Sequence, residues 1–97
     1  MRGAIHEPGR VIWKMQFERE VYGQIREMPR GWQPLDSALQ DGIPTVWFTC
    51  EPSAELEHTR FWLCASGHDT PEEPAHFLGT MQFSAGNVWH LFVEERW

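Results

Sequence analysis

Apolar and polar residues alternate with a period of two over several short stretches of this chain. In residues 11–17, Trp13, Met15 and Phe17 fall on one face while Lys14 and Gln16 fall on the other, which is typical of a half-buried β-strand. The other stretches with strand character are, in chain order, residues 21–28, 33–40, 45–50, 60–65, 77–83 and 88–93. No stretch keeps the 3.6-residue period of a helix for more than a turn or two.

Turn-forming residues separate these stretches. Asp41-Gly42 is typical of a tight two-residue turn, and Ala85-Gly86-Asn87 joins the last two stretches into a hairpin. Residues 66–75 carry turn formers at almost every position. Gly79 lies inside a predicted strand, where glycine indicates a bulge or the close approach of another backbone.

The pattern predicts an all-β fold: a small antiparallel sandwich or a partly open barrel of six to seven short strands. We expect residues 1–10 to form a flexible N-terminal arm and residues 11–97 to form a single β domain. Residues 45–50 and 60–65 are expected to pair as a long hairpin, because polar residues 51–58 read as a loop or one helical turn. That pairing would bring Cys50 close to Cys64.

The aromatic content adds a functional expectation to this fold. The chain of 97 residues contains six tryptophans and six phenylalanines. Each large ring buries about 150–250 Å², and a domain of this size has one thin core. We therefore expect some rings to remain for a surface or a pocket. The tryptophans are Trp13, Trp32, Trp47, Trp62, Trp89 and Trp97.

The balance of charge narrows the range of partners. The net charge is −6, which disfavours binding to long nucleic acids because that binding requires clustered Lys and Arg. Lys14 is the only lysine, so the remaining basic residues are arginines, which can hold a phosphate or a carboxylate through two hydrogen bonds.

Cysteine use and the polar first residues predict the cellular compartment. The chain opens without an apolar leader and has no apolar run of membrane-spanning length. We therefore expect a cytoplasmic protein with reduced thiols and no contact with a membrane. Cys50 and Cys64 both lie in apolar strands, so buried small side chains are favoured over nucleophiles or metal ligands.

Several short motifs follow one another in the order of a known family, most of them in the second half of the chain. They are Ile12-Trp13-Lys14, Pro44-Thr45-Val46-Trp47-Phe48, Thr59-Arg60-Phe61, Ser66-Gly67-His68, Pro71-Glu72-Glu73-Pro74, the segment from Phe77 to Phe83, and Val88-Trp89-His90-Leu91-Phe92. Together they resemble a family of small uncharacterised all-β proteins that are common in bacteriophages and prophages. The resemblance implies a phage or mobile-element context, and it implies no chemistry.

No catalytic or metal motif is evident. The histidines lack the spacing of ligands on one element, so neither a metal nor a cofactor is expected. Ser66-Gly67-His68-Asp69 is not a triad, because sequence neighbours rarely face each other. A thiol–imidazole pair of Cys64 with His68 or His90 stays open, although burial of the thiol argues against it. The carboxylates of Asp69, Glu72 and Glu73 read as a solvated loop.

A ligand site has more support. Residues 66–75 join two strong strands, and loops that strands hold in place often carry recognition. Exposed indoles on neighbouring strands could stack on a nucleobase, an arginine could hold a phosphate, and a Gly-His loop could donate hydrogen bonds. The candidate ligand-binding residues are Trp47, Arg60, Trp62, Gly67, His68, Thr70, Trp89 and His90.

Three functions follow as hypotheses. The first is a non-catalytic, phage-type protein that sequesters a small nucleotide-like or phosphorylated ligand, with a possible role against host defence. The second is an inhibitor of a host protein that uses an acidic face for binding; its carboxylates are Glu51, Glu55, Glu57, Asp69, Glu72 and Glu73. The third is a small enzyme of the phosphodiesterase kind. A homo-oligomer is expected under the first two.

Overall fold

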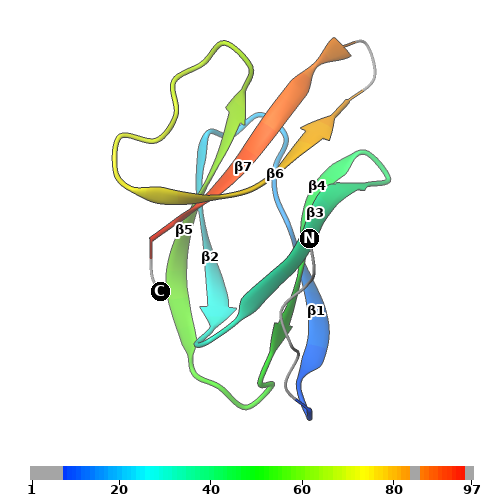
Figure 1. The fold of residues 1–97 in the computed structure, drawn as a ribbon, viewed down its shortest axis with the longest axis vertical. Helices are drawn as coiled ribbons and strands as arrows, with labels where there is room; N and C mark the ends of the chain where they lie inside the picture. Colours follow the sequence, from blue (N-terminus) through cyan, green and yellow to red (C-terminus); the bar gives the residue numbers. More distant parts are fainter. Residues whose placement is uncertain (1–7, 84–85, 96–97) are drawn as a thin grey trace.

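Seven antiparallel strands, arranged in two sheets, make up the part of the chain described by the computed structural model, which is residues 8–83 and 86–95 (Figure 1). They are β1 (Val11–Gln16), β2 (Gly23–Pro29), β3 (Gln33–Gln40), β4 (Ile43–Cys50), β5 (Leu56–Ala65), β6 (Ala75–Gln82) and β7 (Val88–Glu94). The predicted all-β class is confirmed, and the arrangement is a sandwich. Trp97 and most of the predicted N-terminal arm lie outside the described residues.

Strand order is β1-β4-β3 in the first sheet and β2-β5-β7-β6 in the second. The β3–β4 hairpin turns at Asp41-Gly42, as predicted, with Gln40 paired to Ile43 and with positive φ angles of 53° and 78°. Two positive φ angles define a type I′ turn, and Asp-Gly tolerates it well. The connections β1–β2, β2–β3 and β4–β5 each lead from one sheet to the other.

The predicted hairpin of residues 45–50 with residues 60–65 is wrong. β4 lies in the first sheet between β1 and β3, whereas β5 lies in the second sheet between β2 and β7. The chain changes sheets through a turn in which the Ala54 N–H bonds to the Glu51 carbonyl at 3.0 Å, and β5 already begins at Leu56. Both strands have an apolar face, and two layers bury those faces against each other. Cys50 and Cys64 therefore lie in different sheets.

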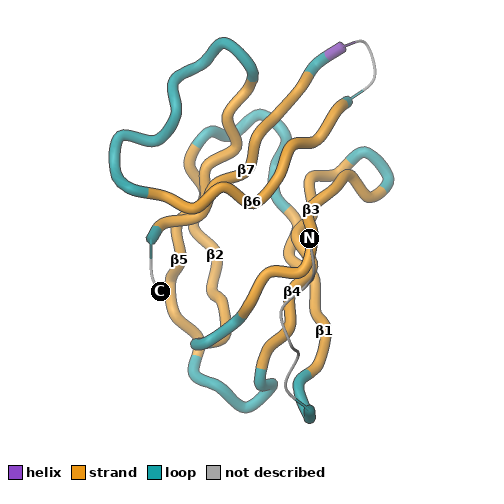
Figure 2. The backbone as a smooth tube through the Cα atoms, in the orientation of Figure 1, coloured by secondary structure: helices purple, strands orange, loops and turns teal. Residues whose placement is uncertain are grey.

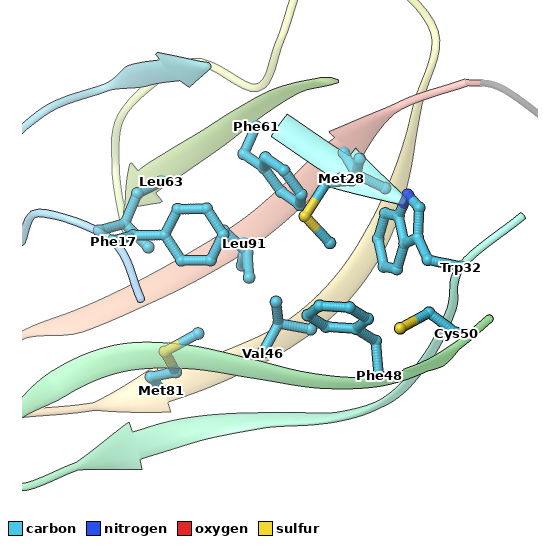
Figure 3. Close-up of a cluster of buried hydrophobic side chains, with 11 residues drawn as sticks. Phe17, Met28, Trp32, Val46, Phe48, Cys50, Phe61, Leu63, Met81 and Leu91 are labelled. Atoms are coloured by element: carbon cyan, nitrogen blue, oxygen red, sulfur yellow. The ribbon is translucent and has the colours of Figure 1, made fainter. Parts of the chain in front are cut away.

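The core lies between the sheets and is built largely from aromatic rings and methionines (Figure 3). Trp32 is central: its ring lies 5.7 Å from Phe48 in an edge arrangement and 5.9 Å from Phe61. Tilted and edge contacts of this kind are favourable for rings beyond the area they bury. The whole buried cluster is Phe17, Met28, Trp32, Val46, Phe48, Cys50, Phe61, Leu63, Met81, Leu91 and Val93.

One side of the sandwich is closed and the other is open. On the closed side, the Ser37 hydroxyl of β3 donates to the Leu78 carbonyl of β6 at 2.9 Å, and a Cβ atom on Gly79 would overlap Ser37 Oγ. A bulge between Phe77 and Gly79 accompanies this approach, so both features expected at Gly79 are present. On the open side, a groove of about 550 Å³ separates β1 from β2 and contains Trp13.

Residues 66–74 cross the outer face of the second sheet; we call them the covering segment. β5 and β6 are both antiparallel to β7, which lies between them, so they run parallel to each other. The chain must therefore return along the sheet before β6 can begin. Figure 2 shows this return as a long loop between the end of β5 and the start of β6. The sequence predicts turn formers at these residues but not the course of the loop over the sheet.

Candidate ligand-binding pocket

Two rows of side chains stand on the outer face of the second sheet. In the first row, Trp62 of β5 and Phe77 of β6 are both paired with Phe92 of β7, which lies between them. In the second row, Cys64 and Thr80 flank His90 in the same way. Strand side chains alternate between faces, so residues two apart on β5 and on β7 stand on the same face. On β6, the bulge between Phe77 and Gly79 brings Thr80 onto the face of Phe77, three residues earlier. An aromatic row therefore adjoins a polar row.

A pocket of about 370 Å³ lies between these rows and the start of the covering segment. The floor is rigid because it belongs to paired strands, whereas the wall is a loop. Phe77 forms an exposed rim, with 57% of its surface accessible, and its ring centroid lies 5.5 Å from that of Phe92. The lining residues are Cys64, Ala65, Ser66, Gly67, His68, Thr70, Phe77, His90 and Phe92.

His90 is held at both ring nitrogens. Nε2 lies 2.9 Å from the Ser66 hydroxyl, and Nδ1 lies 2.9 Å from the Thr80 hydroxyl. A hydroxyl can either donate or accept, so both contacts are satisfied in the neutral imidazole. The two bonds fix the ring plane and tie the start of the covering segment to the β6–β7 hairpin.

A tight turn places Ser66 and Gly67 at the pocket. The His68 N–H bonds to the Ala65 carbonyl at 3.0 Å, and Gly67 at the third position of the turn has a φ of 89°. A positive φ at that position alone defines a type II turn, which favours glycine. The Ser66 N–H bonds to the Val88 carbonyl at 3.0 Å, so the turn is also anchored to β7.

Cys64 forms part of the pocket floor as a protonated thiol. Burial raises the pKa of this thiol, and a hydrogen bond from the Tyr22 hydroxyl only partly offsets that rise. Tyr22 reaches this position because the buried Gln24 side chain holds the preceding turn, donating to the carbonyl oxygens of Glu18 and Val21 at 2.8 Å each. A thiol with a raised pKa is a poor nucleophile at neutral pH.

An acidic region borders the pocket on the β2 side. Tyr22, Trp62, Glu72 and Glu73 line a smaller hollow of about 220 Å³. The Arg60 guanidinium lies 6.0 Å from the centre of the Trp62 ring, and its Nη1 is 3.4 Å from Glu73 Oε2. Burial raises the pKa of the Tyr22 hydroxyl, and Cys64, Asp69 and Glu72 raise it further. The carboxylates beside Tyr22 therefore outnumber the one arginine that pairs with Glu73.

The structure brings together half of the residues predicted for the site. Gly67, His68, Thr70 and His90 all line the pocket. Arg60 and Trp62 stand beside it on the same face of β5, although Trp62 is only 6% exposed.

Trp47 and Trp89 lie elsewhere. Trp47 belongs to the first sheet, where it is paired with Lys14 and Asp36 on the face away from the core. Trp89 packs against the core, with its ring edge-on to Phe83 at 5.9 Å. The expectation that Trp47, Trp62 and Trp89 lie on neighbouring strands is wrong for Trp47. Its strand, β4, belongs to the first sheet, whereas β5 and β7 are neighbours in the second sheet.

The predicted ligand-binding residues do not include Ser66, Phe77 and Phe92, which line the pocket, or Thr80, which holds His90. The alternation in residues 77–83 and 88–93 could have placed Phe77 and Phe92 on the face that carries His90, had the strand pairing been known. Of the two thiol–imidazole pairings left open, the structure places Cys64 directly opposite His90. His68 lines the same pocket from the covering segment.

Over residues 8–83 and 86–95, no group of three or more His, Cys, Asp and Glu side chains could hold a metal ion. No helix in those residues has the length and apolar character needed to cross a membrane.

Comparison with known proteins gives a family but no activity. A family model described as a domain of unknown function (DUF7352) matches residues 8–97. Neither a curated protein nor a solved structure matches this chain. The match spans almost the whole chain, including every strand and the covering segment. The expectation of an uncharacterised domain family is thus confirmed, and the chain belongs to the DUF7352 family.

Proposed function

We propose that this protein binds a small planar heteroaromatic molecule, such as the base of a nucleotide-like ligand, in the pocket beneath the covering segment. The pocket itself carries the proposal: two phenylalanine rings and two histidines surround a preformed hollow of about 370 Å³. Small-molecule sites are typically apolar hollows with a few convergent polar groups, and this one has that composition.

The aromatic rim supports a ring-shaped ligand. Phe77 exposes its ring beside Phe92, so a planar ligand can stack on it without displacing core residues. Stacking of a base on an aromatic side chain contributes about 1–3 kcal/mol. The hydroxyl of Ser66 and the imidazole of His68 can then pair with the ligand's polar edge.

The charge around the pocket favours an uncharged ring over a phosphate. None of the described residues that line the pocket is Lys or Arg. Arg60 is the nearby cation, and Glu73 already pairs with it. A phosphorylated ligand would have to displace Glu73 from Arg60 and tolerate Glu72, so we propose that a nucleoside binds at least as tightly as its phosphate.

We propose that the protein sequesters this ligand, which means that it binds the ligand and does not convert it. The support for sequestration is the resemblance of the sequence motifs to phage and prophage proteins. A phage would benefit from removing a host signalling molecule in the cytoplasm of its host. A signal that carries a nucleobase fits the pocket.

Thermal unfolding with a ligand panel tests the proposal. Free bases, nucleosides and nucleotides are added at 0.1–5 mM (about the range in which weak stacking ligands act), and binding raises the melting temperature. Phe77→Ser should abolish the rise for the ligand that gives it. Leu35→Ser is the matched control, because Leu35 is an equally exposed apolar residue in the first sheet. No rise with any member of the panel would contradict the proposal.

Inhibition of a host protein remains the alternative prediction, and the structure gives it less support. Three of the six proposed carboxylates already pair with arginines of this chain: Glu55 and Glu57 with Arg30, and Glu73 with Arg60. Recovery of one partner from host lysate, weakened by salt, would favour it. The predicted homo-oligomer is tested separately by light scattering, and a monomer at micromolar concentration would remove it.

A further inference from the structure

The hydrogen bond between Ser66 and His90 joins a hydroxyl to an imidazole at the wall of the pocket. Ser66 Oγ is 2.9 Å from Nε2, and the other ring nitrogen is 2.9 Å from Thr80 Oγ1. In serine hydrolases, a base accepts the proton of the nucleophilic hydroxyl while a third group orients that base. His90 takes the position of the base here, although it lies 24 residues from Ser66 in sequence.

The three side chains can adopt the required proton arrangement. When Nδ1 carries the proton and donates a hydrogen bond to Thr80 Oγ1, the lone pair of Nε2 faces the Ser66 hydroxyl. A threonine hydroxyl stabilises a charged imidazole less than a carboxylate does. Any turnover by this arrangement is therefore expected to be slow compared with that of a hydrolase with a buried aspartate.

The turn that holds Ser66 also supplies a donor for a developing oxyanion. The N–H groups of Ser66 and His68 are used within the fold, by Val88 and Ala65. No described residue accepts a hydrogen bond from the N–H of Gly67, which follows the serine directly and lines the same pocket. A backbone N–H next to the nucleophile is a common component of oxyanion holes.

We propose that Ser66 is a nucleophile activated by His90 and that small uncharged aryl esters bound in the pocket acylate it. Ser66 Oγ attacks the ester carbonyl carbon while its proton passes to His90 Nε2. The bond from that carbon to the phenolic oxygen then breaks, and His90 returns the proton to the leaving phenolate. Water, deprotonated by His90, then attacks the acyl carbon; the bond from that carbon to Ser66 Oγ breaks, His90 returns the proton to Ser66 Oγ, and the acyl group leaves as a carboxylic acid.

The substrate class follows from the lining of the pocket. Its two phenylalanines accept an aromatic group, and no lysine or arginine among its described lining residues could neutralise a phosphodiester. A neutral carboxylic ester therefore fits better than the phosphodiester of the enzyme hypothesis. This inference goes beyond the proposed function, and it rests on that function only in using the same pocket.

Phosphonylation by a fluorophosphonate probe tests the nucleophile directly. The Ser66 Oγ–P bond would form as the P–F bond breaks and fluoride leaves, and peptide mapping by mass spectrometry locates the adduct. We expect the folded protein to be labelled at Ser66, and we expect Ser66→Ala to remove the label. Ser53→Ala is the matched control, because Ser53 is an exposed turn serine that donates to Glu51 rather than to a histidine.

Variants of the two supporting residues separate activation from folding. His90→Gln should slow labelling at least tenfold while the protein still melts cooperatively. Thr80 is a positioning residue, so Thr80→Val should slow labelling and Thr80→Ser should restore it. If His90→Gln fails to fold, the comparison of Thr80→Val with Thr80→Ser tests the activation of Ser66 in its place.

Absence of label at Ser66, or an equal rate of labelling in the wild type and in both His90→Gln and Thr80→Val, would overturn the proposal.

Hydrolysis of 4-nitrophenyl acetate measures the full reaction, with bis(4-nitrophenyl) phosphate as the charged comparison. A faster reaction with the phosphodiester would overturn the substrate class. The ligand-induced rise in melting temperature is measured on the same wild-type protein: a rise without label at Ser66 would overturn this inference alone, and label at Ser66 without a rise for any ligand would contradict the proposed function alone.

Discussion

Trp62 and Phe92 are directly paired across β5 and β7 on the outer face of the second sheet, yet the indole of Trp62 is only 6% exposed. An indole on an outer face is ordinarily open to water. Here the covering segment returns over the face, with Glu72 and Glu73 beside the indole. That return also creates the pocket next to Phe92, so the topology of β5, β6 and β7 determines where a ligand can bind.

Tryptophans that the core needs should differ in their effect on stability from those that it does not. Trp32 is 3% exposed and contacts two other rings, whereas Trp13 is 42% exposed at the open groove. We expect Trp32→Ala to lower the free energy of unfolding by about 3–5 kcal/mol, and Trp13→Ala to lower it by less than half of that. Urea denaturation measures both, and equal losses would contradict this account of the core.

The contact between Gly79 and Ser37 should make an alanine at position 79 costly. The added Cβ would overlap Ser37 Oγ, so we expect Gly79→Ala to lower the free energy of unfolding by about 1–3 kcal/mol. Gly23→Ala is the control, because a Cβ there would lie 3.9 Å from Trp62. Adding Ser37→Ala to Gly79→Ala should recover part of the loss, and simple additivity of the two changes would argue against the overlap.

Both thiols should be inert at neutral pH and should make the protein less stable at alkaline pH. Burial raises the pKa of Cys50 and Cys64 above the ordinary 9.0, so the folded protein keeps protons that the unfolded chain releases. Their contribution to stability is complete below pH 9.0 and falls as the pH rises through the raised values. We expect slow reaction with a disulfide reagent at pH 7 that becomes fast in urea. Fast reaction in the folded protein would contradict the burial.

The ion pair of Arg60 with Glu73 should contribute little to stability. Both side chains are about half exposed, at 48% and 53%, and their atoms are 3.4 Å apart. A double-mutant cycle of Arg60→Gln and Glu73→Gln is expected to give a coupling below about 1 kcal/mol that vanishes in 1 M salt (a concentration at which the Debye length is about 3 Å). A larger, salt-resistant coupling would mean that this pair holds the covering segment in place.

Local patterns were sufficient for the class of fold and for several of its details. Alternation located the strands, Asp41-Gly42 identified the hairpin turn, and Gly79 identified the close approach between the sheets. Each of these signals depends on residues close together in sequence or on the lack of a side chain, so no knowledge of pairing is required.

Pairing between distant strands could not be predicted from these patterns. The run at residues 45–50 is apolar on both faces, and nothing in it decides whether β1 or β5 is its neighbour. The same uncertainty concealed the contact of Ser66 with His90, which depends on β7 lying beside β5. Candidate residues within the Ser66–Thr70 segment were found because they are local to one loop, whereas Trp47 was misplaced with its strand.

The position of the bound ligand tests the central claim most directly. The ligand that raises the melting temperature is titrated into ¹⁵N-labelled protein, and the shifted backbone resonances are mapped onto the structure. We predict saturable shifts confined to the lining of the pocket, at Cys64, Gly67, His68, His90 and Phe92, with Trp47 unaffected. Shifts concentrated along β1 and the groove beside Trp13, with none at Gly67 or His90, would contradict the account.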